Sequence, residues 1–309
     1  MRKTLPTFLG IGATRAGTTW LYQNLSSHQN VWMPPEKELH FFDRSTKYPS
    51  PDKLAVTSPI SRILKQRRPK GIRLILESLE KADWKRARWL IHRYLGFYDT
   101  EWYCNLFVQG KKHKQRGEIT LAYSILDAND IKIIQEINPE IKIIFFIRNP
   151  IYQAWSNVKN NYKQNKTQLK DLAASNSDEI ISYLQAPGNL LRRDYERTID
   201  AYLKYFDSKQ ILVCFYDAIL ASPERLMKDI TEFLEIDYFK PDTSRVNQSL
   251  NAEIPAKVIK FLLESCGPTI ANLSKKFDSY ATLWNQCELD AETILQNENV
   301  NQISPTLHP

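Results

Sequence analysis

The chain has 309 residues, 42% of them apolar, and carries a formal net charge of +7. This length can bury one large core, and no run approaches the roughly 20 apolar residues that cross a bilayer, which excludes a membrane-spanning protein. The four cysteines are widely spaced and none clusters with histidines at ligand spacing, so we expect reduced thiols, no disulfide framework and no metal site.

The first predicted element is a buried parallel strand over residues 7–12, followed by a loop and an amphipathic helix. The loop is similar to the phosphate-binding pattern of Gly, four residues, Gly, Lys and then Ser or Thr. Thr18 stands where that lysine would be, and the nearest cation is Arg15, inside the loop. Backbone N–H groups at the start of a helix favour an anion, so we expect an anion-binding loop. The alternative is an ordinary glycine turn.

Residues 34–43 read PPEKELHFFD and carry the next candidate site. If this piece is extended, Glu38, His40 and Phe42 share one face. A carboxylate and an imidazole so placed could supply a general base. The alternative is a charged turn that leads into two buried phenylalanines.

Residues 46–95 are expected to form a basic helical insertion. Between residues 61 and 95 there are eleven Lys or Arg against three acids. The segment could hold an anionic acceptor, contact an acidic membrane surface peripherally, or present a solvated helical face that packs its apolar side on the core. Nucleic-acid binding is not expected, since no recognised nucleic-acid module accompanies the charge.

The apolar run over residues 141–147 is the strongest strand signal, and it ends at Arg148. Asn149 and Pro150 then predict a helix that continues to about residue 163. A nucleotide triphosphatase would end such a strand in an aspartate that holds Mg²⁺, whereas an arginine suits an anion. ATP hydrolysis is therefore not expected. The alternative for Arg148 is an ion-pairing residue on the surface.

A further buried strand is predicted over residues 210–216, a helix from Pro223, and a helical C-terminal part from about residue 256 with a frayed tail. Strands that alternate with amphipathic helices predict an α/β fold with a central, mostly parallel sheet flanked by helices. With no internal repeat and no low-complexity linker, we expect a single domain over residues 1–309.

Three motifs in this order resemble those of sulfotransferases that use 3′-phosphoadenosine 5′-phosphosulfate (PAPS), especially the heparan-sulfate type and its bacterial relatives. They are the loop RAGTT at 15–19, the segment ELHFFD at 38–43, and the strand end RNP at 148–150 with Ser156 eight residues after Arg148. The resemblance extends to about residue 240. Each motif is weak alone, and the three together are specific.

The resemblance implies a P-loop-like three-layer fold and a metal-independent transfer from PAPS to a hydroxyl, with an amine as the second choice. It implies Glu38 as the general base, with Arg15 and His40 as further catalytic residues. The residues that it implies for PAPS binding are Arg15, Ala16, Gly17, Thr18, Thr19, Trp20, Arg148, Ser156 and Ser249. We expect two cationic pockets, with Arg15 at the phosphosulfate and Arg148 at the 3′-phosphate.

The chain departs from the family pattern at three places. Arg15 replaces the usual loop lysine, and because the pKa of a guanidinium exceeds about 12 it should help the leaving group only electrostatically. In the family, a loop with two cations closes over the nucleotide, and the corresponding segment at Ser249 lacks both cations. Ile119 stands where the family has a lysine on the side of the acceptor. Glycosaminoglycan specificity is therefore not carried over. The expected acceptor is a glycan, a lipid-linked alcohol or a small-molecule alcohol, and an anionic acceptor is among the options.

Two alternatives remain open at this point. One is a catalytically inactive nucleotide-binding or scaffold protein of the same fold, suggested by the arginine at residue 15. The other is a kinase-like P-loop enzyme, which would require Mg²⁺-ATP and a lysine in place of Thr18. With no predicted membrane anchor, we expect a cytoplasmic protein of bacterial origin.

Overall fold

The computed structural model describes residues 4–49, 68–96, 98–164, 176–244, 253–277, 279–284 and 303–309. In these residues six strands form one sheet in the order β2-β3-β1-β4-β5-β6. The strands are β1 Phe8–Gly12, β2 Val31–Trp32, β3 Gln115–Ile119, β4 Lys142–Ile147, β5 Ile211–Phe215 and β6 Thr306–Leu307. All neighbours pair in parallel except β6, which is antiparallel to β5. The predicted α/β fold with a mostly parallel sheet is confirmed.

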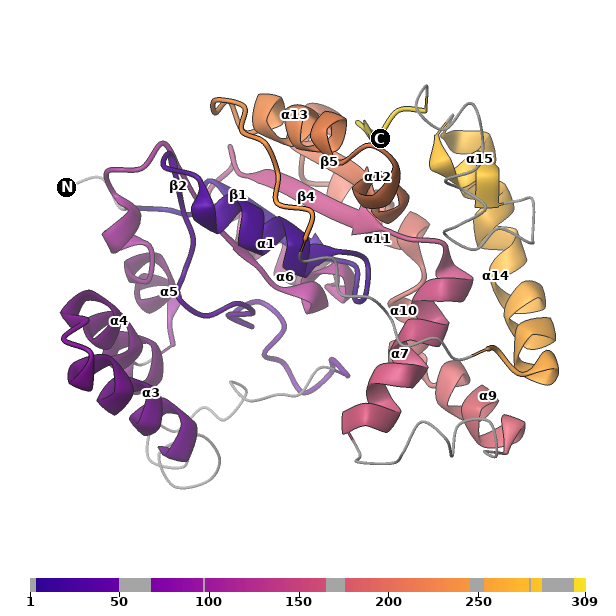
Figure 1. The fold of residues 1–309 in the computed structure, drawn as a ribbon, viewed down its shortest axis with the longest axis horizontal. Helices are drawn as coiled ribbons and strands as arrows, with labels where there is room; N and C mark the ends of the chain where they lie inside the picture. Colours follow the sequence, from indigo (N-terminus) through magenta and orange to yellow (C-terminus); the bar gives the residue numbers. More distant parts are fainter. Residues whose placement is uncertain are drawn as a thin grey trace.

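Helices cover both faces of the sheet (Figure 1). The helices are α1 Thr18–Ser27, α3 Arg68–Glu80, α4 Trp84–Leu95, α5 Thr100–Asn105, α6 Ala128–Ile137, α7 Pro150–Gln164, α9 Ser177–Gln185, α10 Pro187–Leu191, α11 Tyr195–Leu203, α12 Tyr216–Ala221, α13 Pro223–Phe233, α14 Ala256–Lys276 and α15 Tyr280–Trp284. Figure 1 shows α3, α4 and α5 gathered at one end of the molecule, and α7, α9 and α14 at the other.

The three central strands β1, β4 and β5 are apolar along almost their whole length and almost entirely buried. A strand of a parallel sheet is covered on both faces, so it reads as a continuous apolar run, and this is why all three were predictable. Strand β3 is different because its sequence, QRGEI, is polar. The carboxylate of Glu118 on this strand is only 1% exposed, and the local sequence pattern does not predict this burial.

An aromatic cluster packs the segment after β2 onto the core. The ring of Phe41 stacks on Tyr103 with centroids 4.4 Å apart, and Phe42 lies edge-on to Tyr103 and Tyr123 at 5.1 Å. Such contacts contribute about 0.5–1.5 kcal/mol each beyond the area that they bury. The segment that carries Glu38 and His40 is therefore held by the core.

The end of the chain contradicts the prediction of a frayed tail for residues 303–309. Thr306 and Leu307 pair with Cys214 and Val213 of β5, and Thr306 Oγ1 donates to Asp229 Oδ2 at 2.7 Å. These hydrogen bonds cover an edge of the sheet that would otherwise be unpaired. The three described cysteines, Cys104, Cys214 and Cys266, are buried and form no disulfide with one another.

The predicted basic insertion contains the helices α3 and α4, while residues 50–67 lie outside the described residues. Asp83 caps α4 by accepting a hydrogen bond from the backbone N–H of Arg86. On α4, Trp84 is 68% exposed, beside the cations of that helix. Among the described helices, none combines the length and apolar character needed to cross a membrane. The expected peripheral membrane contact through residues 61–95 stays a prediction.

Asp217 on α12 is a buried carboxylate whose replacement should stabilise the fold. Burial raises its pKa to about 6, although Arg148 and the hydrogen bond from Trp284 act in the opposite direction. The folded chain therefore holds this proton more tightly than the unfolded chain, and stability falls as the pH rises from about 4 to 6.

Asp217→Asn keeps an oxygen for Trp284 and removes the buried charge. We expect a melting temperature higher by roughly 2–6 °C at pH 7.5, corresponding to about 1–3 kcal/mol, and no gain at pH 4. Differential scanning calorimetry at both pH values measures this. A lower melting temperature at pH 7.5 would contradict the assignment of a destabilising charge.

Candidate active site

The predicted motifs meet at the carboxyl ends of β1, β3 and β4, the edge at which open α/β sheets bind ligands. The loop 13–17 connects β1 to α1, the segment 34–43 follows β2, and the segment 148–156 follows β4. Two hydrogen bonds tie the loop to the β4 side. Ala13 N donates to Phe146 O at 2.5 Å, and Gln153 Nε2 donates to Thr14 O at 2.9 Å.

Gly17 ends the loop and caps α1 with φ at 91°, in the left-handed region. Glycine offers no side chain to cap the first N–H groups of α1, and the first turn of this helix contains no acidic residue. These groups and the helix dipole are therefore directed at whatever anion the loop receives.

Gly17→Ala should damage the loop, because an added Cβ would lie 2.3 Å from Ile219 Cδ1 at a backbone conformation that alanine disfavours. We expect a loss of about 2–4 kcal/mol in the free energy of unfolding, measured by urea denaturation. Gly267→Ala in α14 is the control, since a Cβ there meets nothing within 4 Å. That variant should be neutral or stabilised by about 1 kcal/mol. Equal effects of the two substitutions would refute the argument.

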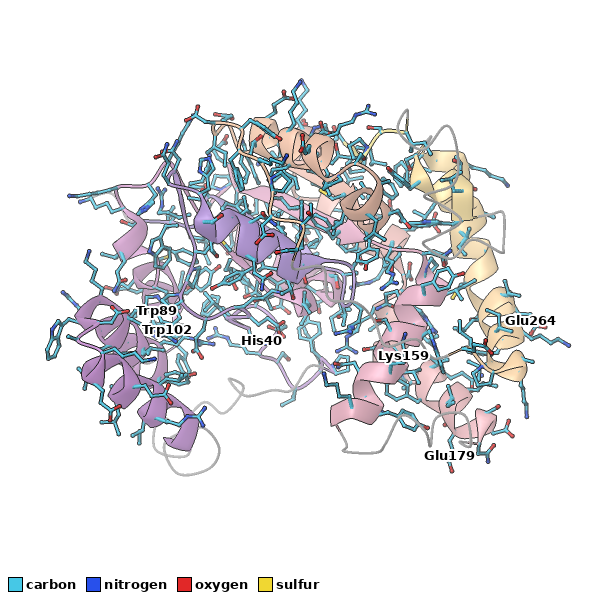
Figure 2. The ribbon with its side chains drawn as sticks, viewed as in Figure 1. His40, Trp89, Trp102, Lys159, Glu179 and Glu264 are labelled. Atoms are coloured by element: carbon cyan, nitrogen blue, oxygen red, sulfur yellow. The ribbon has the colours of Figure 1, made fainter. Side chains whose placement is uncertain are left out.

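A cluster of positive charge lies beside the loop. Arg15 Nε donates to Ser156 Oγ at 3.0 Å, and Arg148 Nη1 donates to the carbonyl oxygen of Arg15 at 3.3 Å. Burial lowers the pKa of Arg15, and the positive charge of Arg148 lowers it further. The same two causes lower the pKa of Lys159 on α7 (Figure 2). Cations that lie this close together form a region of positive potential that suits a phosphate dianion.

The structure therefore brings Arg15, Arg148 and Ser156 into one cluster. From the sequence we expected Arg15 in a separate pocket for the phosphosulfate, beside Thr18 and Thr19. Arg15 has φ at 64°, and its guanidinium lies against Ser156 on α7. A second cation lies at the start of α1, beside Thr18 and Thr19.

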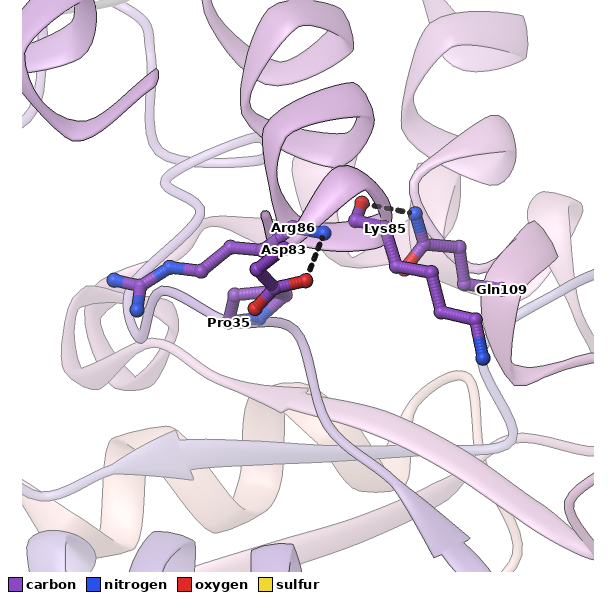
Figure 3. A pocket seen from close by; sticks show the side chains of 5 residues that line it. All are labelled: Pro35, Asp83, Lys85, Arg86 and Gln109. Atoms are coloured by element: carbon purple, nitrogen blue, oxygen red, sulfur yellow. Dashed lines mark hydrogen bonds between the residues drawn. The ribbon is translucent and has the colours of Figure 1, made fainter. Parts of the chain in front are cut away.

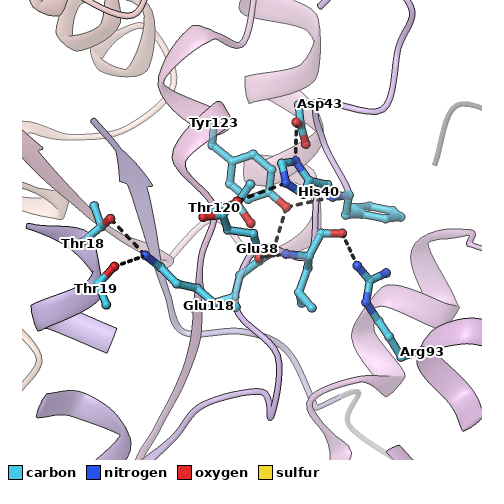
Figure 4. Close-up of polar contacts among 12 residues, drawn as sticks. Thr18, Thr19, Glu38, His40, Asp43, Arg93, Glu118, Thr120 and Tyr123 are labelled. Atoms are coloured by element: carbon cyan, nitrogen blue, oxygen red, sulfur yellow. Dashed lines mark hydrogen bonds and ion pairs between the residues drawn. The ribbon is translucent and has the colours of Figure 1, made fainter. Parts of the chain in front are cut away.

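That cation is Lys37. Its Nζ donates to Thr18 Oγ1 at 3.1 Å and lies 3.4 Å from Thr19 Oγ1, the two hydroxyls at the start of α1 (Figure 4). Burial lowers the pKa of Lys37 to about 8, while the neighbouring charge of Glu38 acts in the opposite direction. A lysine from the segment after β2 thus reaches the loop that has no lysine of its own. Lys37 was not among the site residues that we predicted from the sequence.

Glu38, His40 and Asp43 form a chain of ionisable groups. His40 Nδ1 lies 2.7 Å from Asp43 Oδ2, and His40 Nε2 lies 3.4 Å from Glu38 Oε2. Burial alone would lower the pKa of His40, but the hydrogen bonds to Asp43 and Glu38 outweigh it and raise the pKa to about 9. The imidazole is therefore charged at neutral pH. The Glu38 side chain is 37% exposed and Asp43 only 1%.

The segment around Glu38 is not extended, which was the condition under which Glu38 and His40 were expected to share a face. Glu38 and His40 have φ values of 64° and 53°, both left-handed. The two side chains still meet, because local turns and not strand alternation bring them together.

Strand β3 holds this strained segment in place. Glu38 N donates to Ile119 O at 3.1 Å, and Leu39 N donates to Glu118 Oε2 at 3.3 Å (Figure 4). The carboxylate of Glu118 also accepts hydrogen bonds from the hydroxyls of Tyr103 and Tyr123, at 2.8 and 2.9 Å. Buried carboxylates persist where several donors satisfy them, and here those donors fix the position of Glu38.

Comparison with known protein families decides the class. Residues 6–241, well over half of the chain and all three motifs, match the sulfotransferase family. The chain belongs to the sulfotransferase family. Its enzyme class is therefore transfer of sulfuryl groups, EC 2.8.2. No curated protein sequence matches it closely enough to add to this assignment.

Solved structures agree with the fold of this sulfotransferase. A sulfotransferase from Alicyclobacillus acidocaldarius superimposes with a TM-score of 0.61 at 21% identity, over 90% of this chain and 98% of that one. The sulfotransferase domain from the curacin biosynthetic pathway gives a TM-score of 0.50 at 12% identity, over 84% and 97% of the two chains. At these identities the likeness concerns the fold.

Two residues that the resemblance suggested for PAPS binding have buried side chains in this sulfotransferase. The side chains of Ala16 and Trp20 are buried in the core, at 0% and 3% exposure, and Trp20 lies edge-on to Phe146. Ser249 lies outside the described residues. In the part of the chain that the structure describes, no three His, Cys, Asp or Glu side chains gather as metal ligands would.

A surface depression of about 330 Å³ lies on the sulfotransferase between the beginning of the segment 34–43 and α4 (Figure 3). Its lining residues are Pro35, Asp83, Lys85, Arg86 and Gln109. The polar groups there serve the local structure, since Asp83 caps α4 and Gln109 Nε2 donates to the carbonyl of Lys85. The depression is therefore not a candidate for the donor site.

Proposed function

We propose that this sulfotransferase moves the sulfuryl group of PAPS to a hydroxyl of its acceptor, with an amine as the second choice. One observation supports this most strongly. Lys37 bonds to Thr18 and Thr19, and so the next residue, Glu38, is held beside the anion-binding loop. A base and an anion site side by side are what sulfuryl transfer requires.

Two groups of residues fit the two charged ends of the donor. The first N–H groups of α1 with Thr18 and Thr19 would hold the 5′-phosphosulfate. Arg148, Ser156 and Arg15 would hold the 3′-phosphate, since two cations and a hydroxyl gather there. PAPS supplies an activated sulfuryl group and a phosphate leaving group.

Glu38 is the proposed general base. Its partly exposed carboxylate can reach an acceptor, whereas His40 is already protonated at neutral pH and cannot accept a proton there. His40 instead holds the carboxylate of Glu38 through its Nε2, and Asp43 orients the imidazolium from the other side. His40 is thus a positioning residue, and Glu38 takes the proton of the attacking hydroxyl.

Donor binding and transfer test the proposal in sequence. We expect 3′,5′-diphosphoadenosine to raise the melting temperature without Mg²⁺ and Mg²⁺-ATP to leave it unchanged, because ATP has no 3′-phosphate for Arg148. Labelled sulfate should then pass from PAPS to one member of a panel of glycan, lipid-linked and small-molecule alcohols. Stabilisation by Mg²⁺-ATP alone would instead support a kinase-like enzyme. Stabilisation by the diphosphate without any transfer would support an inactive nucleotide-binding protein.

A further inference from the structure

Lys37 lies at the anion-binding loop but has no role of its own in the transfer described above. Its Nζ is within hydrogen-bond distance of both hydroxyls at the start of α1, although 18 and 19 residues separate them in sequence. The ammonium group is partly buried, and it contacts Thr18, the residue that stands where the phosphate-binding pattern has its lysine. Arg15 cannot fill this place in the same conformation, because its guanidinium is engaged with Ser156.

We propose that Lys37 is the leaving-group cation of this sulfotransferase, supplied from the segment after β2 in place of a loop lysine. The proposal rests on the proposed function, since it needs the phosphosulfate at Thr18 and Thr19. It also revises the role expected of Arg15, which then serves the 3′-phosphate cluster with Arg148.

Lys37 donates a hydrogen bond to the 5′-phosphate oxygen that takes the electron pair of the breaking S–O bond. Glu38 takes the proton of the acceptor oxygen as that oxygen bonds to sulfur. The ammonium keeps its proton and stabilises the charge that develops on the phosphate, so no further reactant is needed. Because Lys37 and Glu38 are adjacent in sequence, one short segment carries both the base and the leaving-group cation.

The surroundings of Lys37 define its pH dependence. The groups that face it are the neutral hydroxyls of Thr18 and Thr19 from α1 and the carboxylate of Glu38 from its own segment. His40 lies 3.4 Å beyond that carboxylate and has a pKa of about 9. Lys37, with a pKa of about 8, loses its charge first as the pH rises. Affinity for a phosphate should therefore fall through this range.

The test uses the full chain and 3′,5′-diphosphoadenosine, titrated calorimetrically between pH 7 and 9. For the wild type we expect the affinity to fall about tenfold over this range. Lys37→Met should bind the nucleotide about tenfold more weakly at pH 7. Its affinity should then no longer fall between pH 7 and 9, except where His40 loses its proton. Lys37→Arg should bind tightly and also lose the fall, because its charge does not titrate. Lys132→Met, an exposed lysine on α6, is the control and should behave as wild type.

Stability separates this role from a merely structural one. If Lys37 only tied the segment to α1, its removal would lower the melting temperature. We expect the melting temperature of Lys37→Met at pH 7 to stay at or above the wild-type value, because a buried ammonium is costly to desolvate. Turnover with PAPS should fall about a hundredfold with the KM for the acceptor unchanged.

The possible outcomes distinguish the two proposals. If the wild type does not bind 3′,5′-diphosphoadenosine, the proposed function fails and the role of Lys37 fails with it. If the wild type binds and transfers sulfate, but Lys37→Met retains the affinity, the pH slope and the turnover of the wild type, only the role of Lys37 is overturned.

Discussion

Glu38→Gln should reduce sulfate transfer by about a thousandfold and leave the affinity for 3′,5′-diphosphoadenosine within about twofold of wild type. The amide is the same size as the carboxylate, so the segment keeps its hydrogen bond from Glu38 N to Ile119 O. It cannot take a proton from the acceptor. Rate measurements at saturating PAPS, with calorimetry of the product nucleotide, give both quantities.

Glu36→Gln is the matched control, two residues earlier in the same segment. Its carboxylate accepts from the Tyr94 hydroxyl of α4 at 2.7 and 2.9 Å, and that contact is part of the packing of the insertion. We expect its turnover to stay within about threefold of wild type. Transfer by Glu38→Gln within about tenfold of wild type would remove Glu38 from the role of general base.

Arg148→Ala should weaken the binding of 3′,5′-diphosphoadenosine about a hundredfold, which corresponds to about 2.7 kcal/mol for a lost charge-assisted contact. Its effect on adenosine 5′-phosphosulfate, which lacks the 3′-phosphate, should be less than about threefold. The discrimination between the two nucleotides therefore collapses in the variant. Competitive binding of both nucleotides to wild type and variant measures this.

The loop itself depends on Arg148, because Arg148 Nη1 donates to the carbonyl of Arg15. The nucleotide without a 3′-phosphate controls for that contact, since it uses the loop alone. Arg73→Ala on α3, a 69% exposed side chain, controls for the loss of a positive charge. If Arg148→Ala weakens both nucleotides equally, Arg148 shapes the loop and does not recognise the 3′-phosphate.

The part of the fold that was predictable from the sequence is the part where burial and periodicity agree. Strands β1, β4 and β5 are apolar because both of their faces are covered. The helix α7 begins at Pro150, and Asn149 Oδ1 accepts from Ile151 N, as the N-cap prediction required. The helix α13 likewise begins at Pro223.

The elements that were missed have no such local signal. Strand β3 contains Gln115, Arg116 and Glu118, and it is a strand because it pairs with β1 and β2 on its two sides. Strand β2 and strand β6 have two residues each, too short for any pattern. The edge strand β6 exists because β5 offers it a partner, which depends on the tertiary fold.

In the candidate site, residues that the sequence singled out lie close together, but their arrangement was not predictable. Glu38 and His40 meet, as do Arg148 and Ser156 through Arg15. The left-handed conformations at Glu38 and His40 were not predictable, since non-glycine residues rarely adopt them. Lys37 was missed because its contacts with Thr18 and Thr19 are tertiary, and its only sequence signal is its position before Glu38.

A crystal structure with bound 3′,5′-diphosphoadenosine tests the central claim most directly. The account predicts the 5′-phosphate at Thr18, Thr19 and Lys37, and the 3′-phosphate at Arg148 and Ser156. A nucleotide bound in the opposite direction, or bound away from both groups of residues, would contradict it.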